Sequence, residues 1–325
     1  MMKALGLFSG GLDSILAALV LREQGIDVTG VTFVTPFFDA AKAIKYSAIA
    51  GIPLLVRDIG VEHLEMLKHP RYGYGRNLNP CIDCHALMFR MAGKILEEEG
   101  FDFLFSGEVL GQRPMSQNAS SLRAVAKTSG IAGRILRPLS AKLLPPTEME
   151  ETGQVDRSRL LDIQGRSRRR QEELARKWGL REYPSSGGGC LLTEKSFVGR
   201  LRALLEDLPD ATLNDVQLLR AGRRFHLGPG LWLTVGRNQE GNEELRRLAR
   251  PEDTLLQARN CAGPVGLVSG NSDMEALQTA AAIIAGYGKG RELAEVTVTA
   301  SCGESVRAIT AAPFSETEIA QRIEV

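Results

Sequence analysis

Residues 9–14 read Ser9-Gly10-Gly11-Leu12-Asp13-Ser14, and this short stretch decides the fold of the N-terminal half. The apolar run over residues 3–8 predicts a buried strand before it, and the spacing of apolar side chains over residues 13–23 predicts a helix after it. Glycines between a strand and a helix let the backbone turn tightly, so several N–H groups can point at one anion. The positive end of the helix adds to that attraction. The stretch therefore predicts a phosphate-binding loop.

The polar side chains of this loop suit a nucleotide phosphate. Ser9 and Ser14 can donate hydroxyl hydrogen bonds, whereas Asp13 would repel phosphate unless it holds Mg²⁺ or another cation. The loop lacks the Gly-Lys-Ser/Thr ending of the Walker pattern, so it is a phosphate loop of a different kind.

Strands and helices alternate along the N-terminal half. Residues 28–34 form a mainly β-branched run that is typical of a buried strand, and a further strand is expected at residues 101–106. The helix over residues 86–99 ends at Gly100, a common stop signal. This alternation predicts an α/β fold, a doubly wound parallel sheet with helices on both faces. Further expected elements are a helix at 39–50, a strand at 53–58 and a helix at 168–178.

The composition changes near residues 207–214, where we place a domain boundary. We expect an N-terminal domain over residues 1–206 and a smaller C-terminal α+β domain over residues 207–325. Gly228-Pro229-Gly230 separates two apolar runs and predicts a hairpin. An alanine-rich helix at 274–285 and a second hairpin at 295–310 are expected after it.

The overall composition excludes some classes of protein. The 325 residues are 43% hydrophobic and 24% charged, which allows a core without disulfides. A net charge of +1 excludes a strongly basic nucleic-acid coat protein, so RNA contacts must come from local patches. No run reaches the roughly 20 apolar residues that a membrane span needs, so we expect a cytoplasmic protein with no membrane partner. The candidate RNA-binding patch, which could equally be solvated surface, is Arg166, Arg168, Arg169 and Arg170.

Three cysteines stand in unusual settings. Cys81-Ile82-Asp83-Cys84 precedes a helix, and Cys190 follows Gly187-Gly188-Gly189. Because a helix N-terminus lowers the pKa of a thiol, we expect Cys81 and Cys84 to be reactive. Cys261 and Cys302 are expected to be packing residues.

The residues alone leave three interpretations of this cysteine set. Three thiolates could hold a 4Fe-4S cluster and leave one iron open to a labile sulfide. Alternatively, one cysteine carries a persulfide and another resolves the resulting disulfide, with no metal. The third interpretation is three separate buried cysteines. The candidate metal ligands are Cys81, Cys84 and Cys190. The same three cysteines and Asp13 are the candidate catalytic residues.

The loop resembles that of the PP-loop ATP pyrophosphatases, which grip the pyrophosphate of ATP while adenylate moves to a substrate. Asn79-Pro80-Cys81-Ile82-Asp83-Cys84 is similar to the catalytic-cysteine segment of tRNA 2-thiouridine enzymes, and residues 106–117 resemble a segment of the 4-thiouridine enzymes. The resemblance implies a PP-loop tRNA thiouridine synthetase that uses ATP and Mg²⁺. It implies nucleotide contacts from Ser9, Gly10, Gly11, Asp13, Ser14, Thr32, Phe33, Ser106, Gly107 and Gln112.

The implied chemistry is adenylation of a uridine carbonyl, followed by replacement of its oxygen with sulfur. The donor would be sulfide or a cysteine desulfurase. Two other functions stay open: a small-molecule PP-loop adenylating synthetase with structural cysteines, and a non-catalytic RNA-binding adaptor. The sequence does not fix the thiolated position or the oligomeric state, and a homodimer is one of the open arrangements.

The C-terminal third resembles the NFACT-R RNA-binding domain. The resemblance is carried by Val235-Gly236-Arg237-Asn238, Gly263-Pro264 and the helical run Ala280-Ala281-Ala282-Ile283-Ile284-Ala285, among others. It implies that tRNA or another structured RNA docks here, with Arg237 and Asn238 as candidate contacts. In the 4-thiouridine enzymes an RNA-binding region precedes the loop. Here the loop begins at Ser9, so we expect the C-terminal domain to supply the docking surface instead.

Overall fold

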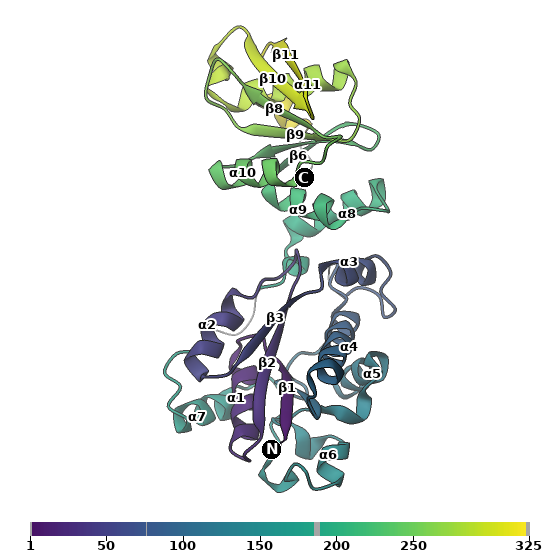
Figure 1. The fold of residues 1–325 in the computed structure, drawn as a ribbon, viewed down its shortest axis with the longest axis vertical. Coiled ribbons are helices and arrows are strands. Elements are labelled where there is room, and N and C mark those ends of the chain that lie inside the picture. The colour runs from purple at the N-terminus through teal and green to yellow at the C-terminus, as the bar shows by residue number, and fades with distance from the viewer. Residues whose placement is uncertain (1, 76, 185–188, 323–325) are drawn as a thin grey trace. The chain divides into compact units, whose positions relative to one another are not determined.

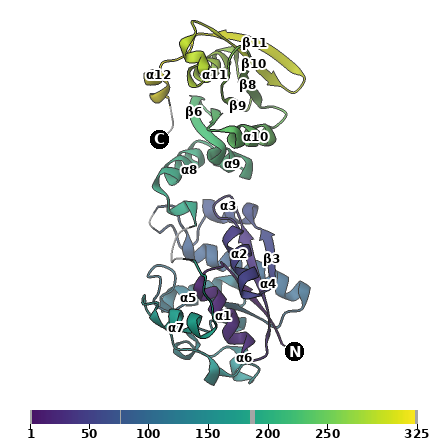
Figure 2. The same ribbon diagram turned by 90° about the vertical axis from the view of Figure 1, so that its left-hand side faces the viewer.

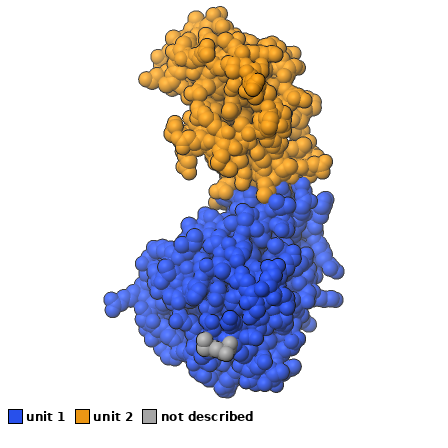
Figure 3. Space-filling model, in the orientation of Figure 1, with its two compact units in different colours: residues 1–193 blue, residues 194–325 orange. Residues whose placement is uncertain are grey.

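The computed structural model describes residues 2–75, 77–184 and 189–322, and its contacts divide the chain into two compact units (Figure 3). The first unit covers residues 1–193 and the second residues 194–325. The division lies before helix α8 (Lys195–Asp207), whereas the composition placed the boundary at 207. Helix α8 falls in the second unit, where it packs beside helix α9 (Leu213–Ala221).

The first unit is built on a five-stranded parallel sheet in the order β3-β2-β1-β4-β5. The central strand β1 pairs with β2 on one side and with β4 on the other. In such a sheet the order reverses beside β1, and ligands bind outside the carboxyl ends of the strands at this point. The strands are β1 (Lys3–Leu7), β2 (Asp27–Val34), β3 (Leu54–Asp58), β4 (Phe103–Ser106) and β5 (Ile135–Leu136).

Helices cover both faces of this sheet (Figure 1). One core cluster joins the sheet to α1, α2 and α7, and a second joins it to α4 and α5, with α3 beside α4. The α/β fold that the alternating pattern predicts is therefore confirmed. The helices are α1 (Leu12–Arg22), α2 (Ala41–Ala50), α3 (Gly60–Lys68), α4 (Cys81–Glu99), α5 (Ala119–Ser129), α6 (Glu148–Glu151) and α7 (Arg169–Lys177).

Two differences from the sequence expectation bear on the site. Helix α4 begins at Cys81 rather than at residue 86, so both cysteines of the CxxC segment belong to its first turns. Helix α3 was not expected at all. It is short, and one of its fully buried residues is a histidine, His63, which a search for apolar periodicity does not register.

The second unit is a six-stranded antiparallel sheet in the order β11-β10-β8-β9-β7-β6. Both expected hairpins are present, since β6 pairs with β7 and β10 pairs with β11. The smaller α+β domain is thus confirmed in class. Its strands are β6 (Gly222–Gly228), β7 (Leu231–Gly236), β8 (Thr254–Ala258), β9 (Val265–Ser269), β10 (Val296–Cys302) and β11 (Ser305–Ala311).

Helices pack on both faces of this second sheet (Figure 2). Helix α11 (Met274–Tyr287) buries its alanine-rich surface in one core cluster, and short α12 (Glu316–Ala320) contacts it. Helices α9 and α10 (Gln239–Leu248) pack in a separate cluster with Val265 and Leu267 of β9. Within the described residues, no helix combines the length and apolar character needed to cross a membrane.

Candidate active site

The phosphate-loop residues lie at the carboxyl end of β1 and lead directly into α1. Gly10 has a φ of +70°, and a Cβ there would lie 2.5 Å from the Lys42 carbonyl oxygen, so glycine is required on both counts. Gly11 is the N-cap of α1 and no side chain caps that end. The first N–H groups of α1 are therefore available to an anion. Ser14 Oγ donates to the Gly11 carbonyl at 2.8 Å, which fixes the turn.

The segment after β4 packs directly on this loop. A Cβ on Gly107 would come within 2.5 Å of the Asp13 carbonyl carbon and the Ser14 nitrogen. Ser106, just before it, is buried at the end of β4. Because β1 and β4 are neighbours in the parallel sheet, their following loops meet at the same edge. The structure thus brings together two segments about a hundred residues apart in sequence.

A hydrogen-bonded chain of side chains holds Asp13. Gln112 Nε2 donates to Asp13 Oδ2 at 2.7 Å, and Gln171 Nε2 donates to Gln112 Oε1 at 3.0 Å. The second carboxylate oxygen, Asp13 Oδ1, is buried with no hydrogen-bond partner. A buried carboxylate oxygen left open beside a phosphate loop fits a divalent cation such as Mg²⁺. Gln171, which is fully buried on α7, was missed from the sequence.

Three cationic side chains gather beside the phosphate loop. Burial lowers the pKa of Lys42, and the positive charges of Arg113 and Arg168 lower it further. Arg168 therefore lies near Lys42, beside the phosphate loop. Its neighbours in the arginine patch are engaged otherwise: Arg169 pairs with Glu173 at 3.1 Å, and Arg170 pairs with Asp162 at 2.7 Å.

The remaining expected contacts differ in exposure. Thr32 and Phe33 are both buried near the end of β2, and Phe33 belongs to the core cluster shared with α4. Ser9 is exposed and accepts a hydrogen bond from the Gly11 N–H at 3.3 Å. Arg166 is exposed on the surface before α7.

The two CxxC cysteines have environments opposite to those expected. Burial raises the pKa of Cys81, an effect that nearby Arg113 partly offsets. Burial also raises the pKa of Cys84 far above its ordinary value, and the charges of Cys190 and Cys81 raise it further. The expectation of lowered thiol pKa values was therefore wrong, because burial outweighs the helix end. The same charge interactions show that Cys190 lies near Cys84.

A buried histidine contacts Cys84. The distance from Cys84 Sγ to His63 Nε2 is 3.4 Å, and burial lowers the pKa of His63 to about 4. The His63 ring packs against Phe37 and Phe38, with ring centroids 5.3 and 5.4 Å away. The N–H of Leu191 donates to the Phe37 carbonyl at 3.0 Å, which fixes the segment that carries Cys190.

The cysteines do not form a metal-ligand set as the structure places them. Over the described ranges, no group of three or more His, Cys, Asp or Glu side chains is arranged to hold a metal ion. Gly187 and Gly188 of the expected glycine run lie outside those ranges. All three candidate ligands are present as free thiols, and the structure shows no 4Fe-4S cluster site among the described residues.

A buried ionic network lies under the loop after β4. Glu108 accepts from Arg137 Nε at 2.8 Å through Oε2 and contacts His85 Nδ1 at 2.8 Å through Oε1. Burial by itself would raise the pKa of Glu108, but the Arg137 guanidinium and the His85 ring outweigh it and hold the pKa at about 2. An anionic Glu108 fixes the Nδ1–H tautomer of His85, next to Cys84.

This network makes a prediction for acid stability. Since folding lowers the pKa of Glu108 from 4.5 to about 2, its contribution is complete above pH 4.5 and is lost as pH falls toward 2. The loss should reach about 3 kcal/mol, since each pKa unit corresponds to about 1.4 kcal/mol. Urea unfolding between pH 7 and 2 would measure it. Glu108→Gln should remove this part of the pH dependence, whereas Glu97→Gln, at an exposed ion pair, should retain it.

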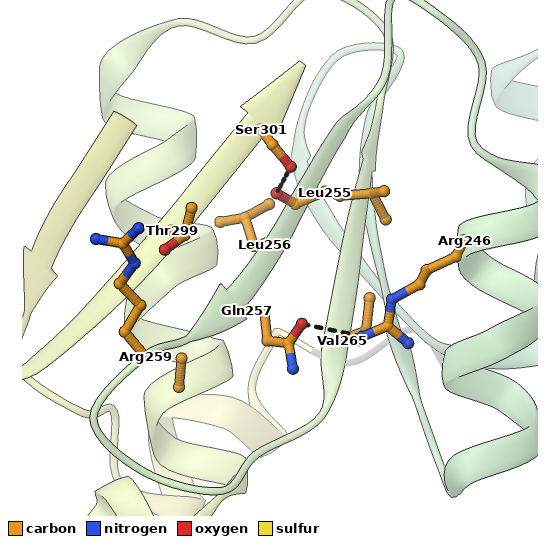
Figure 4. A pocket seen from close by; sticks show the side chains of 9 residues that line it. Arg246, Leu255, Leu256, Gln257, Arg259, Val265, Thr299 and Ser301 are labelled. Atoms are coloured by element: carbon orange, nitrogen blue, oxygen red, sulfur yellow. Dashed lines mark hydrogen bonds between the residues drawn. The ribbon is translucent and has the colours of Figure 1, made fainter. Parts of the chain in front are cut away.

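The second unit carries a shallow pocket of about 270 Å³ on its sheet (Figure 4). Arg246 of α10 and Arg259, which follows β8, stand on opposite sides of it. Arg246 Nη2 donates to Gln257 Oε1 at 2.9 Å, and Thr299 Oγ1 is buried in the wall with no hydrogen-bond partner. Two arginines around a hydroxyl group without a hydrogen-bond partner suit an anionic ligand that can form hydrogen bonds.

The two expected RNA contacts of this unit lie elsewhere on it. Asn238 is the N-cap of α10, and its side chain accepts from the Gly241 N–H at 2.8 Å. Arg237 beside it is exposed. Neither pocket arginine was singled out from the sequence, and Arg259 follows a strand, β8, that was not expected.

Comparison with known proteins relates the two units to different families. Residues 1–142 match the family described as thiamine biosynthesis protein (ThiI), and residues 222–323 match the NFACT protein RNA binding domain. The chain is 34% identical over 117 residues to a tRNA-specific 2-thiouridylase MnmA 1 of Syntrophus aciditrophicus, a match that covers 30% of this chain and 31% of that protein. It is 36% identical over 107 residues to an MnmA of Desulforudis audaxviator, covering 30% of each. The chain spans about a third of the length of these relatives.

Two solved structures are also similar. A 4-thiouridine synthetase in complex with RNA and ATP is 24% identical, with a TM-score of 0.37, over 64% of this chain and 51% of that one. The C-terminal part of a fibronectin/fibrinogen-binding protein from Streptococcus suis is 15% identical, with a TM-score of 0.29, over 74% of this chain and 96% of that one. The two family matches confirm both resemblances noted in the sequence. Residues 1–142 are thus similar to the ThiI family, and residues 222–323 are similar to the NFACT RNA-binding domain.

Proposed function

We propose that this protein is an ATP-dependent tRNA sulfurtransferase, which adenylates a uridine carbonyl and replaces its oxygen with sulfur. One observation carries the proposal. Arg113 follows Gln112, which donates a hydrogen bond to Asp13 at the phosphate loop. The positive charge of Arg113 lowers the pKa of both Lys42 and Cys81, so Arg113 lies near both. Nucleotide-binding and sulfur-bearing groups therefore share one edge of the sheet, as a thiolation reaction requires.

The first step makes the uridine oxygen a leaving group. The carbonyl oxygen attacks the α-phosphorus of ATP, the bond to the bridging oxygen breaks, and pyrophosphate departs. The uncapped N–H groups of α1 and the Ser9 hydroxyl suit the departing phosphates. The open oxygen of Asp13 would hold Mg²⁺, which neutralises phosphate charge. Gln112 keeps the carboxylate oriented for this task.

The second step delivers sulfur. Because Cys190 lies near Cys84, we assign the step to a Cys190 persulfide, supplied by a cysteine desulfurase. Its outer sulfur attacks the activated ring carbon and AMP leaves. Cys84 then attacks the inner sulfur, which forms a Cys84–Cys190 disulfide and releases thiouridine. An external dithiol must reduce that disulfide with two electrons before the next turnover.

The test of the function is direct. The purified protein is incubated with ATP, Mg²⁺, a cysteine desulfurase with cysteine, a dithiol and unmodified tRNA, and the nucleosides are identified by mass spectrometry. We expect a thiouridine that depends on ATP. A small-molecule synthetase would release pyrophosphate without RNA, and an adaptor would bind RNA with no product, so either result would contradict the proposal.

We propose that RNA docks on the second unit at the pocket between Arg246 and Arg259. Changing either residue to glutamine should weaken tRNA binding by the full-length protein. It should also reduce the slope of log affinity against log salt by about one, as expected when one phosphate contact is lost. Arg291→Gln, at an exposed ion pair with Glu316, is the matched control. Unchanged affinity and slope in both pocket variants would place the docking surface elsewhere.

A further inference from the structure

The three cations beside the phosphate loop form no ion pair among the described residues. Lys42, Arg113 and Arg168 appear in none of the ion pairs there, and Arg168 Nε is buried without a hydrogen-bond partner. Lys42 and Arg168 are half-buried, so water screens their mutual repulsion only in part. Such a group is unfavourable by itself and becomes favourable when an anion lies among its members.

Their backbones are fixed around the phosphate loop by contacts that do not depend on charge. The Lys42 carbonyl meets Gly10 so closely that a Cβ would lie 2.5 Å away. Arg168 caps α7, three residues before Gln171. Arg113 is next to Gln112, which bonds both Gln171 and Asp13 at 3.0 and 2.7 Å. Three separate segments therefore converge on one place.

We propose that Lys42, Arg113 and Arg168 form the binding site for the pyrophosphate part of ATP, and that Arg168 serves this ligand rather than RNA. The proposal deepens the proposed function and rests on it. The closely spaced charges of the β- and γ-phosphates match three cations and the α1 N-terminus better than single, widely spaced RNA phosphates do. Arg169 and Arg170, unlike Arg168, are each paired with a carboxylate.

Binding of inorganic pyrophosphate with Mg²⁺, measured by isothermal titration calorimetry on the full chain, tests the site. Lys42→Gln and Arg168→Gln should each weaken binding about tenfold or more, as expected for loss of a charge-assisted contact. Two matched controls lie close in sequence: Lys45→Gln, paired with Glu182, and Arg170→Gln, paired with Asp162. Both controls should bind pyrophosphate like the unchanged protein.

A second measurement separates a ligand site from a structural role. Since the cations repel one another, Lys42→Gln and Arg168→Gln should leave the unliganded protein as stable or more stable in thermal unfolding. A structural role would instead lower the melting temperature. Unchanged pyrophosphate binding in both variants, or a loss confined to tRNA binding, would overturn the inference. Thiouridine formation is assayed separately, so a failure of the proposed function is distinguished from a failure of this site.

Discussion

Asp13→Ala and Ser14→Ala are each expected to reduce RNA-dependent pyrophosphate release by at least about a hundredfold, the cost typical of losing one group that stabilises a charged transition state. Asp13 offers a buried, unpartnered oxygen at the phosphate loop, and Ser14 fixes the turn through its bond to the Gly11 carbonyl. A coupled colorimetric assay of pyrophosphate, run with tRNA and Mg²⁺ at saturating ATP, measures the change.

A matched control is available for the serine. Ser129 is also buried and also donates to a carbonyl three residues earlier, at 2.7 Å, but it lies at the end of α5. Ser129→Ala should therefore keep full activity, while circular dichroism confirms that all variants are folded. If Asp13→Ala and Ser14→Ala both release pyrophosphate at the normal rate, the loop is not the ATP site.

The second large effect concerns the cysteines. Cys84→Ser and Cys190→Ser should abolish thiouridine formation by several orders of magnitude, as removal of a nucleophile does, while pyrophosphate release continues. Cys81→Ser, Cys261→Ser and Cys302→Ser should retain thiolation. The measurement combines nucleoside mass spectrometry with the pyrophosphate assay, so loss of sulfur transfer is seen separately from loss of activation.

The same variants distinguish the persulfide route from the iron–sulfur cluster route. On the persulfide route, anaerobically purified protein is colourless and active without iron. A trapped Cys84–Cys190 disulfide should appear in the peptide map after one turnover without dithiol. A brown protein with about four irons per chain, and loss of both iron and activity in Cys81→Ser, would refute this route in favour of the 4Fe-4S cluster.

The fold was predictable because its signals are local. Each signal affects only the residues next to it in the chain, as with the glycine loop between a strand and a helix, the β-branched run and Gly100. The structure has the same alternation of strands and helices. The expected thiol pKa values failed for the opposite reason. A helix N-terminus can be seen in the sequence, but the burial of Cys84 cannot, nor can the charge of Cys190, about a hundred residues away, which also raises the pKa of Cys84.

Other parts of the site were hidden for the same physical reason. His63 reaches Cys84 from a helix with little apolar periodicity. Gln171 and Lys42 look like ordinary surface residues until α7 and α2 are placed against the phosphate loop. Contacts between segments far apart in the chain decide which polar residue is buried, and a single sequence does not contain them.

The segment from the end of β2 to the first turn of α2 contacts both the phosphate loop and the stretch of chain that carries Cys190. At one end, the Phe37 carbonyl accepts from Leu191, next to Cys190. At the other end, Lys42 abuts Gly10 of the phosphate loop. A shift of this segment on nucleotide binding would therefore also move Cys190, to which the proposed function assigns the persulfide. On that proposal, the linkage would delay sulfur transfer until a base has been adenylated.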